Sequence, residues 1–222
     1  SMPTAESGGI ILLTGANGTT GHAIIRHLVK RGATVRGLVR SKASAAAIEA
    51  LGAQASIGNL RDVASLDAAF ADVDRVYHLP PGLQPDEVDI AKNVIGAAQR
   101  ARVQLFGYHS VSYPQLPAVR FHWEKLKSEI EILYSGLTFF IVRPCQYMQN
   151  VRWSMPRILD EGVFALPWSP DRKMVSVDVE DMGEAIAILL TEGGFARGTD
   201  QFCSVERALT RREIAAHLSD AL

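Results

Sequence analysis

The feature that most constrains the fold is a strict alternation of short apolar runs with amphipathic segments from residue 9 onward. Six runs rich in aliphatic and β-branched residues predict strands at 9–14, 34–39, 53–58, 75–80, 103–110 and 137–144. The segments between them carry apolar residues at three- and four-residue spacing, which predicts helices. Alternation of this kind favours parallel strands joined by right-handed crossovers, so we expect a doubly wound α/β fold.

Three glycines stand three residues apart where the first strand ends and the first helix begins, in the stretch TGANGTTG. In a βα unit this spacing is typical of a turn that binds the pyrophosphate of a dinucleotide. Gly15 would permit the turn, Gly18 would leave room for the pyrophosphate, and Gly21 would let the helix pack closely on the strand. Thr19 and Thr20 add hydroxyl donors and a helix cap. The alternative is that the glycines serve turn geometry and packing alone.

The end of the second strand indicates which dinucleotide is preferred. An Asp or Glu about 20 residues after the glycines would bind the ribose hydroxyls of NAD, but the stretch VRGLVRSKAS contains no acid. It places Arg40 and Lys42 there, with Arg36 nearby, and these cations suit the 2′-phosphate of NADP. We therefore expect NADP(H) to be preferred over NAD(H). The alternative is that these residues are solvated surface cations.

Composition excludes several classes of partner. The 222 residues carry a formal net charge of -1, so the overall field gives no attraction to nucleic acid or to an anionic membrane. No apolar run approaches the roughly 18 residues that a membrane span needs. Cys145 and Cys203 lack the spacing of a metal site or a disulfide framework, so we expect neither. These features favour a soluble cytoplasmic protein without a metal.

These observations divide the chain into three parts. Residues 1–8 show no periodicity and are typical of a tag remnant with a flexible N-terminus. Residues 9–146 are expected to form an NAD(P)-binding Rossmann domain. After Pro144 the composition shifts toward Pro, Met and Trp. We expect residues 147–222 to form a small, reduced cap on the substrate side, with the last strand, 201–205, and the last helices packed on the Rossmann sheet.

Several motifs together resemble one family. They are TGANGTTG, LVRSKAS, GNLRD at 58–62, VYHLPPG at 76–82, FHWEKLKSEIEILYSGLTFFIVRPCQYMQN at 121–150 and SVDVEDMGEAIAILL at 176–190. Over residues 9–220 the chain resembles the NmrA-like branch of the atypical short-chain dehydrogenases and reductases. The motifs are specific for the family and much less so for any one activity.

The resemblance implies contacts along the whole dinucleotide. The pyrophosphate would be held by Gly15, Asn17, Gly18, Thr19 and Gly21, and the 2′-phosphate by Arg40 and Lys42. Further along, the adenine would be bordered by Asn59 and Leu60, the central ribose by Leu79, Pro80 and Pro81, and the nicotinamide side by Ser110 and Lys125. The substrate pocket would be floored by the residues from Pro144 to Tyr147.

One position departs from the pattern of the wider family. Its reductases use a Tyr-x-x-x-Lys pair, in which the phenol donates a proton, whereas the residue four before Lys125 is Phe121. A phenyl ring cannot act as an acid. Lys125 or a bound water would then supply the proton, while Ser110 would hydrogen-bond the acceptor oxygen or the carboxamide of the nicotinamide. Tyr113 is a further candidate if its hydroxyl reaches the same place.

The other candidates for the substrate pocket each have a structural alternative. His122 is a candidate proton donor, or it bonds a backbone carbonyl. Cys145 is a redox-sensing thiol or a small apolar residue. Tyr147 suits a flat aromatic substrate, or it packs in the core.

Two functions remain open at this point. The first is an NADP(H)-dependent oxidoreductase that transfers hydride to a small carbonyl, quinone or similar acceptor. The second is a non-catalytic NADP-binding redox sensor that acts through a protein partner. Phe121 and the reduced cap favour the sensor, and the glycine loop suits both functions. A homodimer is compatible with either.

Overall fold

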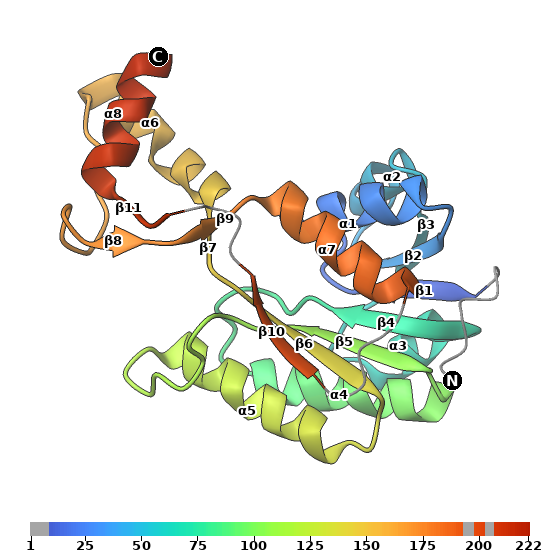
Figure 1. Cartoon of the computed structure of the whole chain (residues 1–222). Helices are drawn as coiled ribbons and strands as arrows, with labels where there is room; N and C mark the ends of the chain where they lie inside the picture. The colour runs from blue at the N-terminus through green and yellow to red at the C-terminus, as the bar shows by residue number, and fades with distance from the viewer. Residues whose placement is uncertain (1–8, 193–197, 203–206) are drawn as a thin grey trace.

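The computed structural model describes residues 9–192, 198–202 and 207–222, and its centre is a seven-stranded parallel sheet (Figure 1). Across the sheet the strands follow the order β3-β2-β1-β4-β5-β6-β10. Their bounds are β1 Ile10–Leu13, β2 Thr34–Val39, β3 Gln54–Ile57, β4 Val73–His78, β5 Leu105–His109, β6 Phe139–Pro144 and β10 Gly198–Phe202. The doubly wound parallel fold predicted from the alternation is confirmed.

Helices cover both faces of the sheet and create two cores. One face is covered by α1 (Thr19–Lys30), α2 (Lys42–Glu49) and α7 (Val179–Glu192), and the other by α3 (Val63–Ala69), α4 (Glu87–Ala101) and α5 (Arg120–Tyr134). Successive strand side chains point to opposite faces, so Leu13 joins the first core while Leu12 joins the second. Because both faces are buried, the strands read as continuous apolar runs rather than alternating ones.

The segment after β6 builds a small lobe before the chain returns to the sheet. It contains β7 (Gln146–Tyr147), the 3₁₀ helix η1 (Met148–Ser154), α6 (Met155–Glu161), β8 (Lys173–Met174) and β9 (Ser176–Val177). At the end of the chain, β11 (Leu209–Thr210) pairs with β8, and α8 (Arg211–Ala221) follows. Figure 1 shows α6 and α8 in a lobe that projects away from the sheet.

Helix α7 and strand β10 return to the main body of the molecule. A Cβ on Gly183 of α7 would lie 2.8 Å from the carbonyl carbon of Ala23, so the glycine allows α7 to pack directly on α1. Arg26 and Glu180 form an ion pair between the same two helices. Strand β10 extends the sheet beside β6 in parallel. The expected last strand, 201–205, overlaps β10 at its first two residues, and its other residues lie outside the described part, as do residues 1–8.

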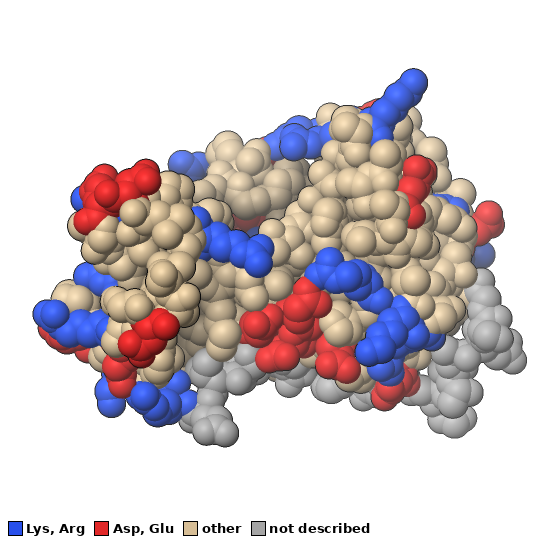
Figure 2. Space-filling view, turned by 90° about the horizontal axis from the view of Figure 1, so that it is seen from above, with Lys and Arg blue, Asp and Glu red and all other residues tan. Residues whose placement is uncertain are grey.

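Charges on the visible face are mixed. In the view of Figure 2, basic and acidic side chains are interspersed over a surface that is mostly uncharged. No helix within the described residues is long and apolar enough to cross a membrane.

Candidate functional site

A cavity opens at the carboxyl ends of the strands, beside β1. The strand order reverses there, because β2 follows on one side of β1 and β4 lies on its other side. In open α/β sheets this reversal of strand order is where ligands bind. The cavity volume is about 620 Å³. Its lining comes from four segments, namely residues 15–20 of the glycine loop, the end of β2 with Ser44, residues 58–61 after β3, and residues 79–82 with Gln84 after β4.

The three glycines of the loop have different requirements. Gly15 has a φ of +64°, and a Cβ there would lie 2.5 Å from the carbonyl oxygen of Leu79. A Cβ on Gly21 would lie 2.4 Å from the carbonyl oxygen of Gly15. The nearest atom to a Cβ on Gly18 is 3.5 Å away, an ordinary contact. The fold itself therefore requires Gly15 and Gly21, whereas the open space above Gly18 fits a ligand such as a pyrophosphate.

The first turn of α1 is suited to an anion. Gly18 occupies the N-cap position without a side-chain cap, and the first turn contains no acidic residue. The backbone N–H groups of this turn have no intrahelical partner, and the helix dipole favours negative charge there. The side chain of Asn17 is held in place, because its amide donates to Ser44 Oγ at 3.0 Å and its carbonyl oxygen contacts His22 Nε2 at 3.2 Å.

The end of β2 brings Arg40 to the cavity, but it does not bring all of the expected cations. Arg40 lines the cavity, whereas Lys42 is exposed at the start of α2 and is not among the lining residues. Arg36 points elsewhere, since its guanidinium donates to the carbonyl oxygens of Ala69 at 2.9 Å and Ala71 at 2.6 Å. The expectation that Arg36 assists at this end is therefore wrong.

A second arginine lines the cavity, and the sequence interpretation missed it. Arg61 donates to both carboxylate oxygens of Asp86, at 2.6 and 2.8 Å, and to Gln84 at 3.1 Å. Hydrogen bonding to Asp86 raises the pKa of Arg61. Arg61 lies within the GNLRD stretch beside Asn59 and Leu60, which also line the cavity, so its position was the available signal. The lining contains two arginines and no Asp or Glu.

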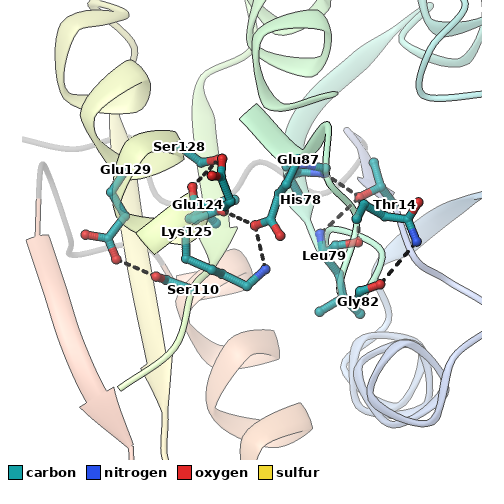
Figure 3. A network of polar contacts seen from close by, with 12 residues as sticks. Thr14, His78, Leu79, Gly82, Glu87, Ser110, Glu124, Lys125, Ser128 and Glu129 are labelled. Atoms are coloured by element: carbon teal, nitrogen blue, oxygen red, sulfur yellow. Dashed lines mark hydrogen bonds and ion pairs between the residues drawn. The ribbon is translucent and has the colours of Figure 1, made fainter. Parts of the chain in front are cut away.

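Lys125 lies in a largely buried network of polar contacts that includes Glu87 (Figure 3). Its Nζ is 2.7 Å from Oε1 of Glu87, and that oxygen also accepts from the hydroxyl of Tyr108 at 2.9 Å. Burial lowers the pKa of Lys125, and the attraction of Glu87 opposes that shift. Lys125 does not line the cavity in this structure. Glu87 was not anticipated from the sequence.

Ser110 is also bound to a buried carboxylate. Its hydroxyl donates to Glu129 Oε1 at 2.5 Å, and Glu129 receives two further bonds from the guanidinium of Arg143, at 2.9 and 2.5 Å. Ser110 has an exposed fraction of 2%. Its hydroxyl hydrogen therefore points at Glu129, and Ser110 is not among the residues that line the cavity, which differs from the expected contact with an acceptor.

Two buried histidines lie beside these networks. His78 Nδ1 lies 2.7 Å from the hydroxyl of Thr14, and its Nε2 has no hydrogen-bond partner among the described residues. His109 is bonded on both sides, by Tyr77 and Tyr147. Burial, with a smaller contribution from the charge of Lys125, lowers the pKa of each histidine to about 3. Both rings are therefore neutral at physiological pH.

The expected substrate residues lie at the carboxyl ends of β5 and β6. Tyr113 is 57% exposed and has a φ of 54°. The Nδ1 of His122 lies 3.0 Å from the carbonyl oxygen of Tyr113. This contact with a backbone carbonyl is the structural alternative to a role as proton donor. Phe121, in the place of the usual tyrosine, is 39% exposed.

The residues that follow β6 are held by local contacts. The carbonyl oxygen of Pro144 accepts from the hydroxyl of Ser112 at 2.9 Å. Cys145 is disulfide-bonded and is not a free thiol. The expectation of a chain without a disulfide is therefore wrong at Cys145, and Cys203 lies outside the described residues. No cluster of metal-binding side chains occurs in the part of the chain that the structure describes.

Comparison with known proteins gives consistent matches. A family model described as the NmrA-like family matches residues 8–221. An NAD(P)H azoreductase from Xenophilus azovorans is 30% identical over 214 residues, which are 96% of this chain and 73% of that protein. Quinone oxidoreductase 2 from Escherichia coli is 27% identical over 212 residues, which are 95% of this chain and 73% of that protein.

Solved structures of similar fold include proteins with bound coenzyme. The NADPH-dependent quinone oxidoreductase of Escherichia coli complexed with NADPH has a TM-score of 0.85 and 27% identity, and the match covers 95% of this chain and 75% of that one. The Citrobacter sp. triphenylmethane reductase complexed with NADP(H) also has a TM-score of 0.85, at 22% identity, over 96% of this chain and 75% of that one. At that identity the second likeness concerns the fold alone.

Proposed function

Because the chain belongs to the NmrA-like family of atypical short-chain dehydrogenases and reductases, we propose that it is an NADP(H)-dependent reductase of a quinone, carbonyl compound or similarly polarised small acceptor. The observation that carries this proposal is the cavity, whose lining combines the glycine loop with two arginines and no carboxylate. The acceptor class is supported by the relatives that are named for quinone and azo reduction.

NADPH, when bound, supplies a hydride, which is a proton carrying two electrons. The residues of the chain bind and orient it. The open space at Gly18 and the free amides of the first turn of α1 suit the pyrophosphate. The remaining contacts in this proposal are those of Asn17, Thr19 and Thr20 with the phosphates, Asn59 and Leu60 with the adenine, and Leu79, Pro80 and Pro81 with the ribose, all of which line the cavity.

Preference for NADP(H) over NAD(H) follows from charge. NAD-binding sites place a carboxylate against the adenosine ribose, and that carboxylate would repel a 2′-phosphate. This cavity has no carboxylate in its lining and has Arg40 at the end of β2. A guanidinium can donate two hydrogen bonds to a phosphate, and such charge-assisted bonds are stronger than neutral ones. In this proposal Arg40 is the residue that selects the phosphorylated coenzyme.

Specific observations favour a second function, the NADP-binding sensor. Phe121 stands where a reductase of the wider family has its proton donor. Lys125 and Ser110 are both bound to buried carboxylates rather than directed into the cavity. A sensor would need a protein partner, which stays a prediction, as do a homodimer and a cytoplasmic location.

Two measurements on the same protein separate these functions. Fluorescence titration with NADPH and NADH measures coenzyme affinity. The loss of NADPH absorbance then measures turnover with quinones, azo dyes, aldehydes, ketones and imines. Gly18→Val serves as the coenzyme-binding control, because its branched side chain would occupy the open space above the loop.

Each outcome decides between the functions. NADPH binding with acceptor-dependent oxidation that Gly18→Val abolishes supports the reductase. Tight NADPH binding without turnover of any acceptor supports the sensor and ends the reductase proposal. Failure to bind either coenzyme contradicts both functions.

A further inference from the structure

Three ring side chains form a hydrogen-bonded row at the carboxyl ends of the central strands. Tyr77 on β4 contacts His109 Nδ1 through its hydroxyl at 2.7 Å, and Tyr147 on β7 contacts His109 Nε2 through its hydroxyl at 2.6 Å. Tyr77 and His109 are buried, whereas Tyr147 is partly exposed. The side chain of Thr20, which lines the cavity, lies beside the phenol of Tyr147 and lowers its pKa. The row therefore runs from the core to the edge of the cavity.

The direction of the hydrogen bonds in this row follows from burial. His109 is neutral, so one ring nitrogen carries a hydrogen and the other is an acceptor. Tyr77 is fully buried, and His109 is the hydrogen-bond partner found for its hydroxyl among the described residues. Because an unpaired buried hydroxyl hydrogen is costly, Tyr77 donates to Nδ1. The hydrogen of His109 is then on Nε2, which donates to the oxygen of Tyr147.

The oxygen of Tyr147 accordingly accepts hydrogen bonds and keeps its own hydrogen for another partner. Burial raises the pKa of Tyr147 well above its usual value, and the neighbouring side chain of Thr20 opposes that shift. Tyr147 therefore holds its proton at neutral pH. The N–H of His109 also stabilises the phenolate that remains once the proton has left.

From this geometry we propose that Tyr147 donates the proton to the acceptor's oxygen, replacing the phenol missing at position 121, and that His109 is its positioning residue. The inference rests on the proposed reductase function. Hydride addition to a carbonyl carbon moves the carbon–oxygen π pair onto oxygen. The O–H bond of Tyr147 breaks, its proton goes to that oxygen, and the electron pair remains on the phenol oxygen. Water at the edge of the cavity returns a proton to Tyr147, past Thr20.

Substitution of the phenol tests the proposal in the full-length protein. Tyr147→Phe should lower kcat by about 100-fold, within the usual range for loss of a general acid. NADPH affinity should stay near that of the wild type, since the substitution removes one hydroxyl outside the cavity lining. Tyr134→Phe is the matched control, because Tyr134 is 87% exposed at the end of α5. Tyr113→Phe tests the other tyrosine near this site.

The outcomes separate this inference from the proposed function. If the wild type turns over an acceptor and Tyr147→Phe retains that turnover, the inference is overturned and the proposed reductase function stands. The same holds if turnover is lost in Tyr113→Phe instead of in Tyr147→Phe. Tight NADPH binding by the wild type without turnover overturns both. A loss confined to Tyr147→Phe supports both.

A second measurement needs neither coenzyme nor turnover. Nitrogen NMR of the histidine-labelled protein reports which ring nitrogen carries the hydrogen, and His109→Gln assigns the signal. The row predicts a neutral His109 protonated at Nε2, with an Nε2 resonance that shifts in Tyr147→Phe. This tautomer is the one that leaves the hydrogen of Tyr147 available to the acceptor. Protonation at Nδ1 instead would reverse the direction of the bonds and overturn the proposal.

Discussion

The ammonium of Lys125 lies 2.7 Å from the carboxylate of Glu87, where the side chains are only 12% and 2% exposed. The two residues come from different helices, α5 and α4, which pack on the same face of the sheet. A charge in such a place is stable only if an opposite charge accompanies it. The pair therefore couples the position of Lys125 to the packing of the two helices.

Removal of one partner should destabilise the fold. Glu87→Gln leaves Lys125 without its compensating charge and should lower the free energy of unfolding by about 3–5 kcal/mol, the usual cost of breaking a buried pair. Lys127→Met removes an exposed cation from the same helix and should cost less than about 1 kcal/mol. Urea denaturation measures both. Equal stability of Glu87→Gln and the wild type would contradict the structural role of the pair.

The glycines of the loop should separate into two kinds. Gly21→Ala places a methyl 2.4 Å from a backbone oxygen and should destabilise the fold by about 1–3 kcal/mol. Gly18→Ala meets no such contact and should cost about 1 kcal/mol or less, yet weaken NADPH binding about tenfold or more. Thermal unfolding and NADPH titration of both variants check this. If Gly18→Ala left NADPH affinity unchanged, the pyrophosphate would not lie over Gly18.

Acid should destabilise the protein through its buried histidines. The pKa of His78 falls from 6.5 to about 3 on burial, so the unfolded chain binds the extra proton between these values and the folded protein does not. Stability contributed by neutral His78 is thus present above pH 6.5 and is lost as pH falls, by about 1.4 kcal/mol per pH unit. His78→Asn keeps a partner for Thr14 and should reduce that slope by this amount. Urea denaturation from pH 6 to pH 4 measures it, with the exposed His217→Asn as the substitution control. An unchanged slope would mean that His78 is protonated in the folded protein.

Local sequence patterns were sufficient for the fold and for the part of the cavity that the glycine loop and the end of β2 line. The periodicities of strands and helices involve residues that are close together in the sequence, and so does the spacing of Gly15, Gly18 and Gly21. The placement of Arg40 at the cavity follows because it comes directly after β2. These features can be predicted without knowing which side chains from distant parts of the sequence contact one another.

The surroundings of Lys125 and Ser110 could not be predicted in the same way. Lys125 and Glu87 are 38 positions apart in the sequence, and Tyr77 and His109 are 32 apart. Their pairing depends on how α4, α5 and the strand ends pack, which no single segment encodes. Motif matching placed Lys125 and Ser110 at this end of the site, but buried carboxylates on neighbouring elements determine where their polar atoms point.

The most direct test of the central claim is a titration of wild type and Arg40→Ala with NADPH and NADH. We expect the wild type to bind NADPH more tightly, and Arg40→Ala to lose about 1.5–3 kcal/mol of NADPH binding, about 10- to 150-fold, with NADH affinity nearly unchanged. Lys42→Ala, outside the cavity lining, should cost about 0.2–1 kcal/mol. Equal weakening of both coenzymes by Arg40→Ala, or no binding of NADPH by the wild type, would contradict the account.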